Sequence, residues 1–215
     1  MNVRLAVWTA FVLLFSALNY AARAASGTPD RNVLYRYSTA LGGVVQYALI
    51  LAVMLAIAHG LSRREAFALR RPPSSPRALG LGLAVLIAVY AVSAVLSPLL
   101  HPGREQGLTP TGWQPAHAGA YALNFLVVAL VAAVVEELTF RGLGYTLMLR
   151  FGTWPAILLT GLFFGLAHGL VDGLPLLALF GCLLAWLRSR TRSVYPGIVV
   201  HGTFNSIALI LAVTT

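Results

Sequence analysis

The stretch LNFLVVALVAAVVEELTFR, residues 123–141, decides what kind of protein this chain forms. Asn124 is its only strongly polar residue before two consecutive carboxylates, Glu136 and Glu137. An acidic residue at the centre of a membrane-spanning helix costs about 2.5–3.5 kcal/mol on insertion scales. Two in succession therefore need a partner, a proton or water. The stretch predicts a membrane-spanning helix whose charges have a purpose.

The whole chain has the same apolar character. Of its 215 residues 59% are hydrophobic and 10% are charged, and the mean hydropathy is +0.82, whereas about 25% of residues are charged in a soluble domain. A spanning helix needs about 20 mostly apolar residues. We therefore predict an all-α protein, a single polytopic transmembrane domain over residues 1–215, with about seven spans. The apolar runs cover residues 3–22, 39–59, 78–100, 119–140, 154–170, 174–187 and 194–213. Residues 144–151 are expected to form a further short, partial helix at the membrane surface.

The net charge of +9 comes from fifteen basic residues, all of them arginine. They lie between apolar runs, which disfavours nucleic acid and favours anionic lipid headgroups as the partner. Because cytoplasmic loops carry the excess of basic residues, we expect a multi-pass protein of the cell membrane with a cytoplasmic N-terminus and an external C-terminus. The predicted inner segments hold Arg4, Arg63, Arg64, Arg70, Arg71, Arg77, Arg141, Arg150, Arg188, Arg190 and Arg192, and the outer ones hold Arg23, Arg31, Arg36 and Arg104.

Three segments outside the motifs need separate comment. Two of them allow two interpretations each, and the third is expected to be a loop. The first apolar run could be a cleaved secretory signal, because Ala22-Arg23-Ala24 resembles a cleavage site, although the run is long and further spans follow at once. Residues 61–71 could lie on the cytoplasmic headgroups or form a solvated linker. Residues 101–117 are expected to form an external loop. The single cysteine, Cys182, excludes an intramolecular disulfide.

Charged side chains in the deciding stretch are not equivalent. Arg141 follows Glu137 by four residues, so these two share a helix face and can pair. Glu136 points about 100° away from them and lacks that partner, since successive residues of a 3.6-residue helix differ by that angle. One carboxylate is therefore expected to be structural and the other available. The alternative is that both lie at the helix end and reach water there.

Two further apolar runs carry isolated polar residues. His168 follows Phe164 by four residues, and His201 lies four residues before Asn205 on one face of its helix. Taken singly, each fits a hydrogen-bonded structural role between helices. Gly161, Gly165 and Gly169 are spaced for close helix packing, and we interpret them in that way.

Together these groups suggest a buried hydrolytic site. A carboxylate, two imidazoles and a carboxamide on three helices can take a proton from water and donate to a developing oxyanion. The chain has no Gly-x-Ser-x-Gly motif, no phosphate-binding glycine loop and no His-Glu-x-x-His motif. A zinc site built from Glu136, His168 and His201 is an open alternative.

The motifs Glu136-Glu137-x-x-x-Arg141, Phe164-x-x-x-His168 and His201-x-x-x-Asn205 resemble, in order, those of the CAAX prenyl endopeptidase and bacteriocin-processing (CPBP, or abortive-infection) family. They lie in a motif-bearing core of about residues 119–213. The resemblance implies a helical intramembrane protease of the glutamate type that requires no metal or other cofactor. It implies that Glu136 and His168 activate water and that His201 and Asn205 stabilise the oxyanion. It also implies supporting roles for Glu137 and Arg141, and a packing or substrate-contacting role for Phe164.

Substrate and site access are predicted only in outline. The substrate would be a membrane-bound peptide or protein, cut near its C-terminus or hydrophobic anchor, as in CAAX-like processing, removal of a sorting helix or maturation of a secreted peptide. His168 and Glu136 come from different depths of the predicted spans, so we expect a water-filled cavity open to the cytoplasm. The alternative function is a transporter or scaffold that uses the same residues as a proton or ion path.

Overall fold

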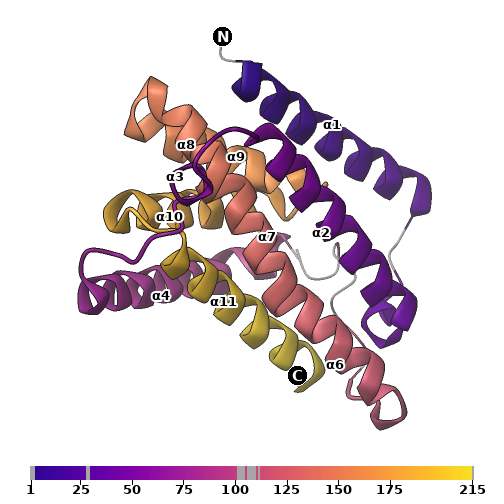
Figure 1. Ribbon diagram of the computed structural model, residues 1–215. Coiled ribbons are helices and arrows are strands. Elements are labelled where there is room, and N and C mark those ends of the chain that lie inside the picture. Colours follow the sequence, from indigo (N-terminus) through magenta and orange to yellow (C-terminus); the bar gives the residue numbers. More distant parts are fainter. Residues whose placement is uncertain (1–2, 28–29, 101–104, 106–109, 111, 215) are drawn as a thin grey trace.

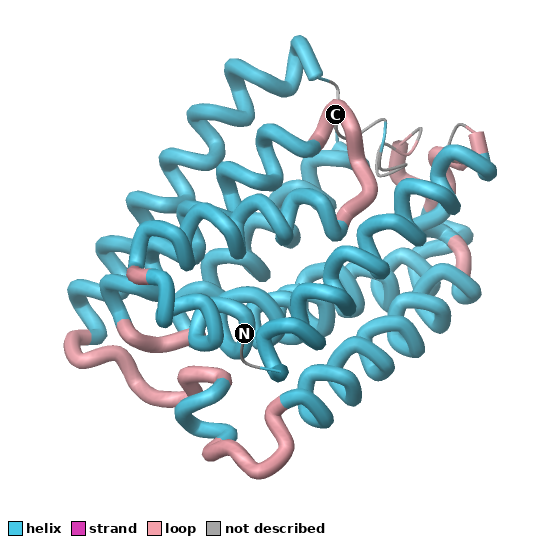
Figure 2. The backbone as a smooth tube through the Cα atoms, turned by 90° about the horizontal axis from the view of Figure 1, so that it is seen from above, coloured by secondary structure: helices cyan, strands magenta, loops and turns pink. Residues whose placement is uncertain are grey.

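The computed structural model describes residues 3–27, 30–100, 105, 110 and 112–214, and these contain helices and no strand. Figure 2 shows the helices running side by side along one direction. Within these described residues, six helical segments are long and apolar enough to span a membrane. The helix over the fifth apolar run, α9 (Thr153–Ala167), is shorter. The predicted all-α polytopic bundle is confirmed.

A long central helix organises the bundle (Figure 1). It is flanked by α1 (Val3–Ser26) and α2 (Tyr37–Ile57) on one side, and by α4 (Ser75–Leu100), α10 (Leu174–Thr191) and α11 (Tyr195–Thr214) on the other. The short helices α3 (Arg63–Ala66), η1 (Val33–Tyr35) and η2 (Pro115–His117) lie in the connections.

The central helix runs for 37 residues, from Pro115 to Phe151. Its successive parts are α6 (Ala118–Leu126), η3 (Val127–Ala132), α7 (Ala133–Glu137), η4 (Leu138–Gly144), α8 (Tyr145–Met148) and η5 (Leu149–Phe151). Both η3 and η4 are π-helical. Such turns are rare and frequently lie at functional sites. Here they lie directly before and after α7, the short segment that ends with the Glu136-Glu137 pair.

The separate surface helix expected at residues 144–151 is wrong. These residues continue the central helix, and Tyr145 and Met148 are buried. Gly142 and Gly144 lie at close contacts between this helix and its neighbours. A Cβ atom on Gly144 would lie 2.3 Å from the Trp8 ring, and one on Gly142 would lie 3.1 Å from Phe67 Cα.

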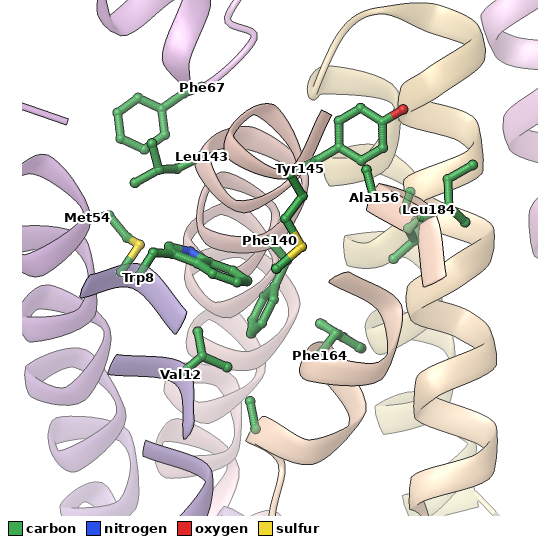
Figure 3. Close-up of a cluster of buried hydrophobic side chains, with 14 of the residues drawn as sticks. Trp8, Val12, Met54, Phe67, Phe140, Leu143, Tyr145, Ala156, Phe164 and Leu184 are labelled. Carbon is green, nitrogen blue, oxygen red and sulfur yellow. The ribbon is translucent and has the colours of Figure 1, made fainter. Parts of the chain in front are cut away.

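Residues 61–71 are held to the bundle by their middle part, whereas residues 61–65 and 70–71 are exposed. Ala66, Phe67 and Ala68 are buried, so this loop folds into the bundle. Phe67 lies beside Leu143 in Figure 3. The backbone N–H of Val194 donates to Ala68 O over 3.2 Å, which ties the loop to the start of α11. Most of the expected external loop, residues 101–104, 106–109 and 111, lies outside the described residues.

Glycines bring α9 and α10 into close contact, as their spacing predicted. A Cβ atom on Gly161 would lie 2.4 Å from Cys182 Sγ and 2.6 Å from Cys182 N. A Cβ atom on Gly181 would likewise lie 2.7 Å from the Gly161 carbonyl oxygen. Gly169 differs, because it lies beyond the end of α9, has a φ of 63° and faces Asn19 of α1.

The α9–α10 contact predicts the effect of the smallest possible substitution. Gly161→Ala would force the two backbones apart and should lower stability by about 1–3 kcal/mol, the usual cost of overpacking. The measurement is the thermal unfolding midpoint of the purified protein in detergent. Gly42→Ala in α2 is the matched control, because nothing lies within 4 Å of its added methyl group. Equal midpoints for the two variants would contradict the prediction.

Candidate active site

Glu136 lies at the centre of a polar cluster inside the bundle. Its Oε1 accepts a hydrogen bond of 2.7 Å from the Tyr47 hydroxyl of α2. Its buried Oε2 has no hydrogen-bond partner among the described residues. Oε2 lies 3.8 Å from His168 Nε2 and 3.8 Å from His201 Nε2. Both distances exceed a direct hydrogen bond, and a separation of this size is commonly bridged by water.

The course of the central helix explains how Glu136 and His168 meet. Glu136 stands fifteen residues before Phe151, and His168 stands fifteen residues after Thr153, across the turn at Gly152. The two segments pack against each other along an antiparallel hairpin. At about 1.5 Å per residue, each residue lies about 22 Å from the turn. The sequence predicts a mismatch in depth because its apolar run ends near residue 140. The central helix instead continues to Phe151, and this places Glu136 farther from the turn.

Hydrogen bonds on the far side of each ring orient the two imidazoles. His168 Nδ1 lies 2.7 Å from the Phe164 carbonyl, and His201 Nδ1 lies 3.2 Å from Glu137 Oε1. Both partners are acceptors, so each Nδ1 carries a proton and, in a neutral ring, each Nε2 presents its lone pair to the cluster. Phe164 packs edge-on against both rings, with centroid distances of 4.7 and 5.6 Å.

Glu137 and Arg141 form the predicted pair. Arg141 Nη1 donates to Glu137 Oε1 over 2.8 Å, and both side chains are completely buried. Arg141 Nη2 also donates to the Gly181 carbonyl of α10 over 3.0 Å. The guanidinium lies over the Phe164 ring at 4.3 Å from its centroid. Glu137 therefore connects Arg141 to His201, and His201 in turn faces Glu136.

Asn205 is a predicted catalytic residue whose side chain binds a backbone carbonyl. Its Nδ2 donates to the Val128 carbonyl, within η3, over 3.0 Å. This bond joins α11 to the π-helical part of the central helix. Its second amide hydrogen is the one that a catalytic role would require.

Sequence reasoning missed Tyr47. It lies beside Gln46 in an otherwise apolar run, and this polar pair was the available signal. Only the folded chain shows that its hydroxyl meets Glu136 and so leaves Oε2 as the free oxygen.

A cavity of about 410 Å³ leads to the cluster. Glu136, His168 and Tyr47 are among its lining residues, and one face of α1 forms a wall. His201 lies behind Glu136 and is almost fully buried. The full lining consists of Phe11, Val12, Phe15, Asn19, Ala22, Arg23, Ser26, Gly27, Gln46, Tyr47, Ile50, Glu136, Thr139, Phe140, Ala167 and His168. In the part of the chain that the structure describes, no group of three His, Cys, Asp or Glu side chains is arranged to hold a metal ion.

Residues 118–207 match the family model for type II CAAX prenyl endopeptidase, Rce1-like. The matched segment contains all three motifs, and the match confirms the resemblance inferred from them. This part of the chain is similar to the Rce1-like family, which supports a CAAX-type intramembrane protease in general, and the long apolar helices indicate a membrane protein. No curated protein and no solved structure shows a significant match.

The two neighbouring carboxylates should differ in what they do for stability. Glu137→Gln leaves the Arg141 charge buried without its counter-ion, and breaking a buried pair costs about 3–5 kcal/mol. Glu136→Gln keeps an acceptor for Tyr47 and should change stability much less. Thermal unfolding in detergent measures both. A Glu136→Gln loss as large as that of Glu137→Gln would contradict this division.

Proposed function

We propose that the protein is a glutamic-type intramembrane endopeptidase. It hydrolyses a peptide bond of a membrane-associated substrate near the substrate's C-terminus or hydrophobic anchor. The observation that carries the proposal is the unpartnered Glu136 Oε2, which faces Nε2 of His168 and of His201 at 3.8 Å each, while Glu136 lines a cavity. A water molecule in this position is within reach of a base and of the incoming carbonyl carbon.

Glu136 serves as the general base. Tyr47 holds Oε1, so Oε2 takes a proton from the water while the water oxygen forms a bond to the carbonyl carbon. The carbonyl π electrons move to oxygen, which gives a tetrahedral oxyanion. Collapse of this intermediate breaks the C–N bond, and the proton passes from Glu136 to the leaving amine. His168 lines the cavity beside Glu136 and orients the water through Nε2.

His201 and Asn205 stabilise the oxyanion. His201 donates from Nε2 when both ring nitrogens carry a proton, and its Nδ1 contact with Glu137 Oε1 fixes the direction in which Nε2 points. Asn205 contributes its second amide hydrogen, since the first is donated to Val128. Donors fixed before the reaction are worth more in a buried site than in water.

Glu137, Arg141 and Phe164 support the site from behind. The ion pair fixes the central helix and, through Glu137, the ring of His201. Phe164 packs between the two imidazoles and carries the guanidinium on its face. It is completely buried, which favours packing over substrate contact.

Activity measurements test these roles. Glu136→Gln and His168→Ala should each lower the cleavage rate by about 100-fold or more, the usual contribution of a positioned acid–base group. The probes are a lipidated peptide with a CAAX-type C-terminus and an unlipidated peptide beside an apolar helix, each in proteoliposomes. Glu65→Gln is the matched control, because this carboxylate is exposed in α3. Full activity of both site variants would refute the assignment.

Chelation tests the proposal that catalysis needs no metal. The cleavage rate should stay unchanged after prolonged treatment with a zinc chelator and removal of the chelated metal, because Glu136 itself supplies the base. Loss of activity that returns on adding zinc would instead support the set of Glu136, His168 and His201 as metal ligands.

A further inference from the structure

One end of the bundle collects most of the arginines. It contains the start of α1, the loop around α3, the turn between the central helix and α9, and the turn between α10 and α11. The hydrogen bonds that hold these segments together include those from Arg4 to the His59 carbonyl and from Arg70 to the Arg192 carbonyl. We call this end the arginine face. Its arginines are Arg4, Arg63, Arg64, Arg70, Arg71, Arg77, Arg150, Arg188, Arg190 and Arg192.

The opposite end has a different charge. Within the described residues it carries Arg23, Arg31 and Arg36 as arginines, together with Asp30, Glu105 and Asp172. Asp30 pairs with Arg36, and Glu105 accepts from the backbone N–H groups of Val171 and Gly173. By the positive-inside rule, the arginine face lies in the cytoplasm and this end lies outside.

The cavity is closed toward the arginine face. Trp8, Met54, Phe67, Phe140 and Leu143 fill the space between α1, α2 and the central helix on that side, and each is nearly or fully buried (Figure 3). Trp8 meets the Phe140 ring edge-on, with centroids 6.1 Å apart. A separate hollow at the arginine face shares no lining residue with the cavity; it is lined by Val3, Arg4, Val7, Val53, Ala56, Ile57 and His59.

The cavity extends in the other direction. Asn19 Nδ2 donates to the Ala167 carbonyl over 2.7 Å, so Asn19 marks the level of His168 on α1. The lining continues past this level through Ala22 and Arg23 to Gly27. At about 1.5 Å per residue, it reaches about 12 Å beyond Asn19 toward the external end.

We propose that the active site opens to the extracytoplasmic side of the membrane, between α1 and α2, and receives an extended peptide segment from that side. This rests on the proposed function, which makes Glu136 the catalytic group. It also revises the expected cytoplasmic opening. If the N-terminus is cytoplasmic, the lining that follows α1 to Gly27 leads to the opposite face of the membrane. From Val12 to Gly27 the lined wall measures about 22 Å, the length of about six residues of extended chain.

The opening defines a substrate class. A lipidated C-terminus that stays in the cytoplasm is separated from the cavity by the buried side chains around Trp8 and Phe140. A segment just outside a membrane anchor, or a translocated peptide, lies on the right side. Asn19, Arg23, Ser26 and Gln46 line the wall and suit a polar backbone, and Arg23 favours an acidic group near the mouth.

Thiol labelling tests the side of the opening without any need for activity. In a Cys182→Ala background, Gln46→Cys places a thiol in the cavity. Val45→Cys is the matched control, one residue away on α2 and 50% exposed but outside the lining. Ser62→Cys marks the arginine face. A membrane-impermeant thiol reagent is added to intact cells and, separately, to inverted membrane vesicles.

Gln46→Cys should react from outside intact cells about tenfold or more faster than Val45→Cys, because the reactive thiolate forms in water and not against lipid. Ser62→Cys should react only in inverted vesicles. Reaction of Gln46→Cys from the cytoplasmic face, or from neither face, would overturn the proposal. Adding Glu136→Gln should leave the labelling pattern unchanged, because labelling does not require catalysis. Labelling therefore tests the opening alone, and the cleavage rate of Glu136→Gln tests the catalytic assignment.

Discussion

The ion pair between Glu137 and Arg141 is the interaction on which the rest of the structure depends. Two complete charges lie in an interior of apolar helices, where an uncompensated charge is not tolerated. Each member of the pair also binds a group on a neighbouring helix. Arg141 binds a carbonyl of α10, and Glu137 binds the imidazole on α11. A single pair of residues on one helix thereby fixes the positions of two neighbouring helices.

Close approach of these helices depends on small residues at the contacts. A Cβ atom on Gly197 would lie 2.5 Å from Glu137 Oε2, so the carboxylate occupies the space that a side chain there would take. A Cβ atom on Gly202 would likewise lie 2.8 Å from the Ala129 carbonyl oxygen of η3. The glycines of α11 thus bring His201 to the central helix, where it faces Glu136 and Glu137 of α7.

The sequence predicted the bundle, the positions of most spans and the Glu137–Arg141 pair, because spacing along one helix determines which side chains share a face. It also selected Glu136, His168 and His201 as a group, and the structure brings these three together. It did not predict the length of the central helix. Gly142 and Gly144 have the same local signal whether they end a helix or admit a neighbour, and only Trp8 and Phe67, far away in the sequence, decide between the two.

Tyr47 illustrates a second limit. A tyrosine in an apolar run has many possible partners, and nothing local connects residue 47 to residue 136. The loop around Phe67 is similar, because its burial depends on a gap between helices that exists only after they have packed. Contacts of this kind depend on the complete arrangement and not on any motif.

The short length of α9 has a consequence for the surrounding lipid. Its 15 residues extend about 22 Å, whereas the hydrocarbon core of a bilayer is about 30 Å thick. Trp154, Leu158 and Leu162 are exposed on its outer surface, so this helix contributes to the lipid boundary of the bundle. A bilayer adapts to such a short apolar surface by thinning next to it. The histidine at the end of α9 is then nearer to the headgroups than its place in the fold suggests, and the thickness of the membrane becomes part of the environment of the site.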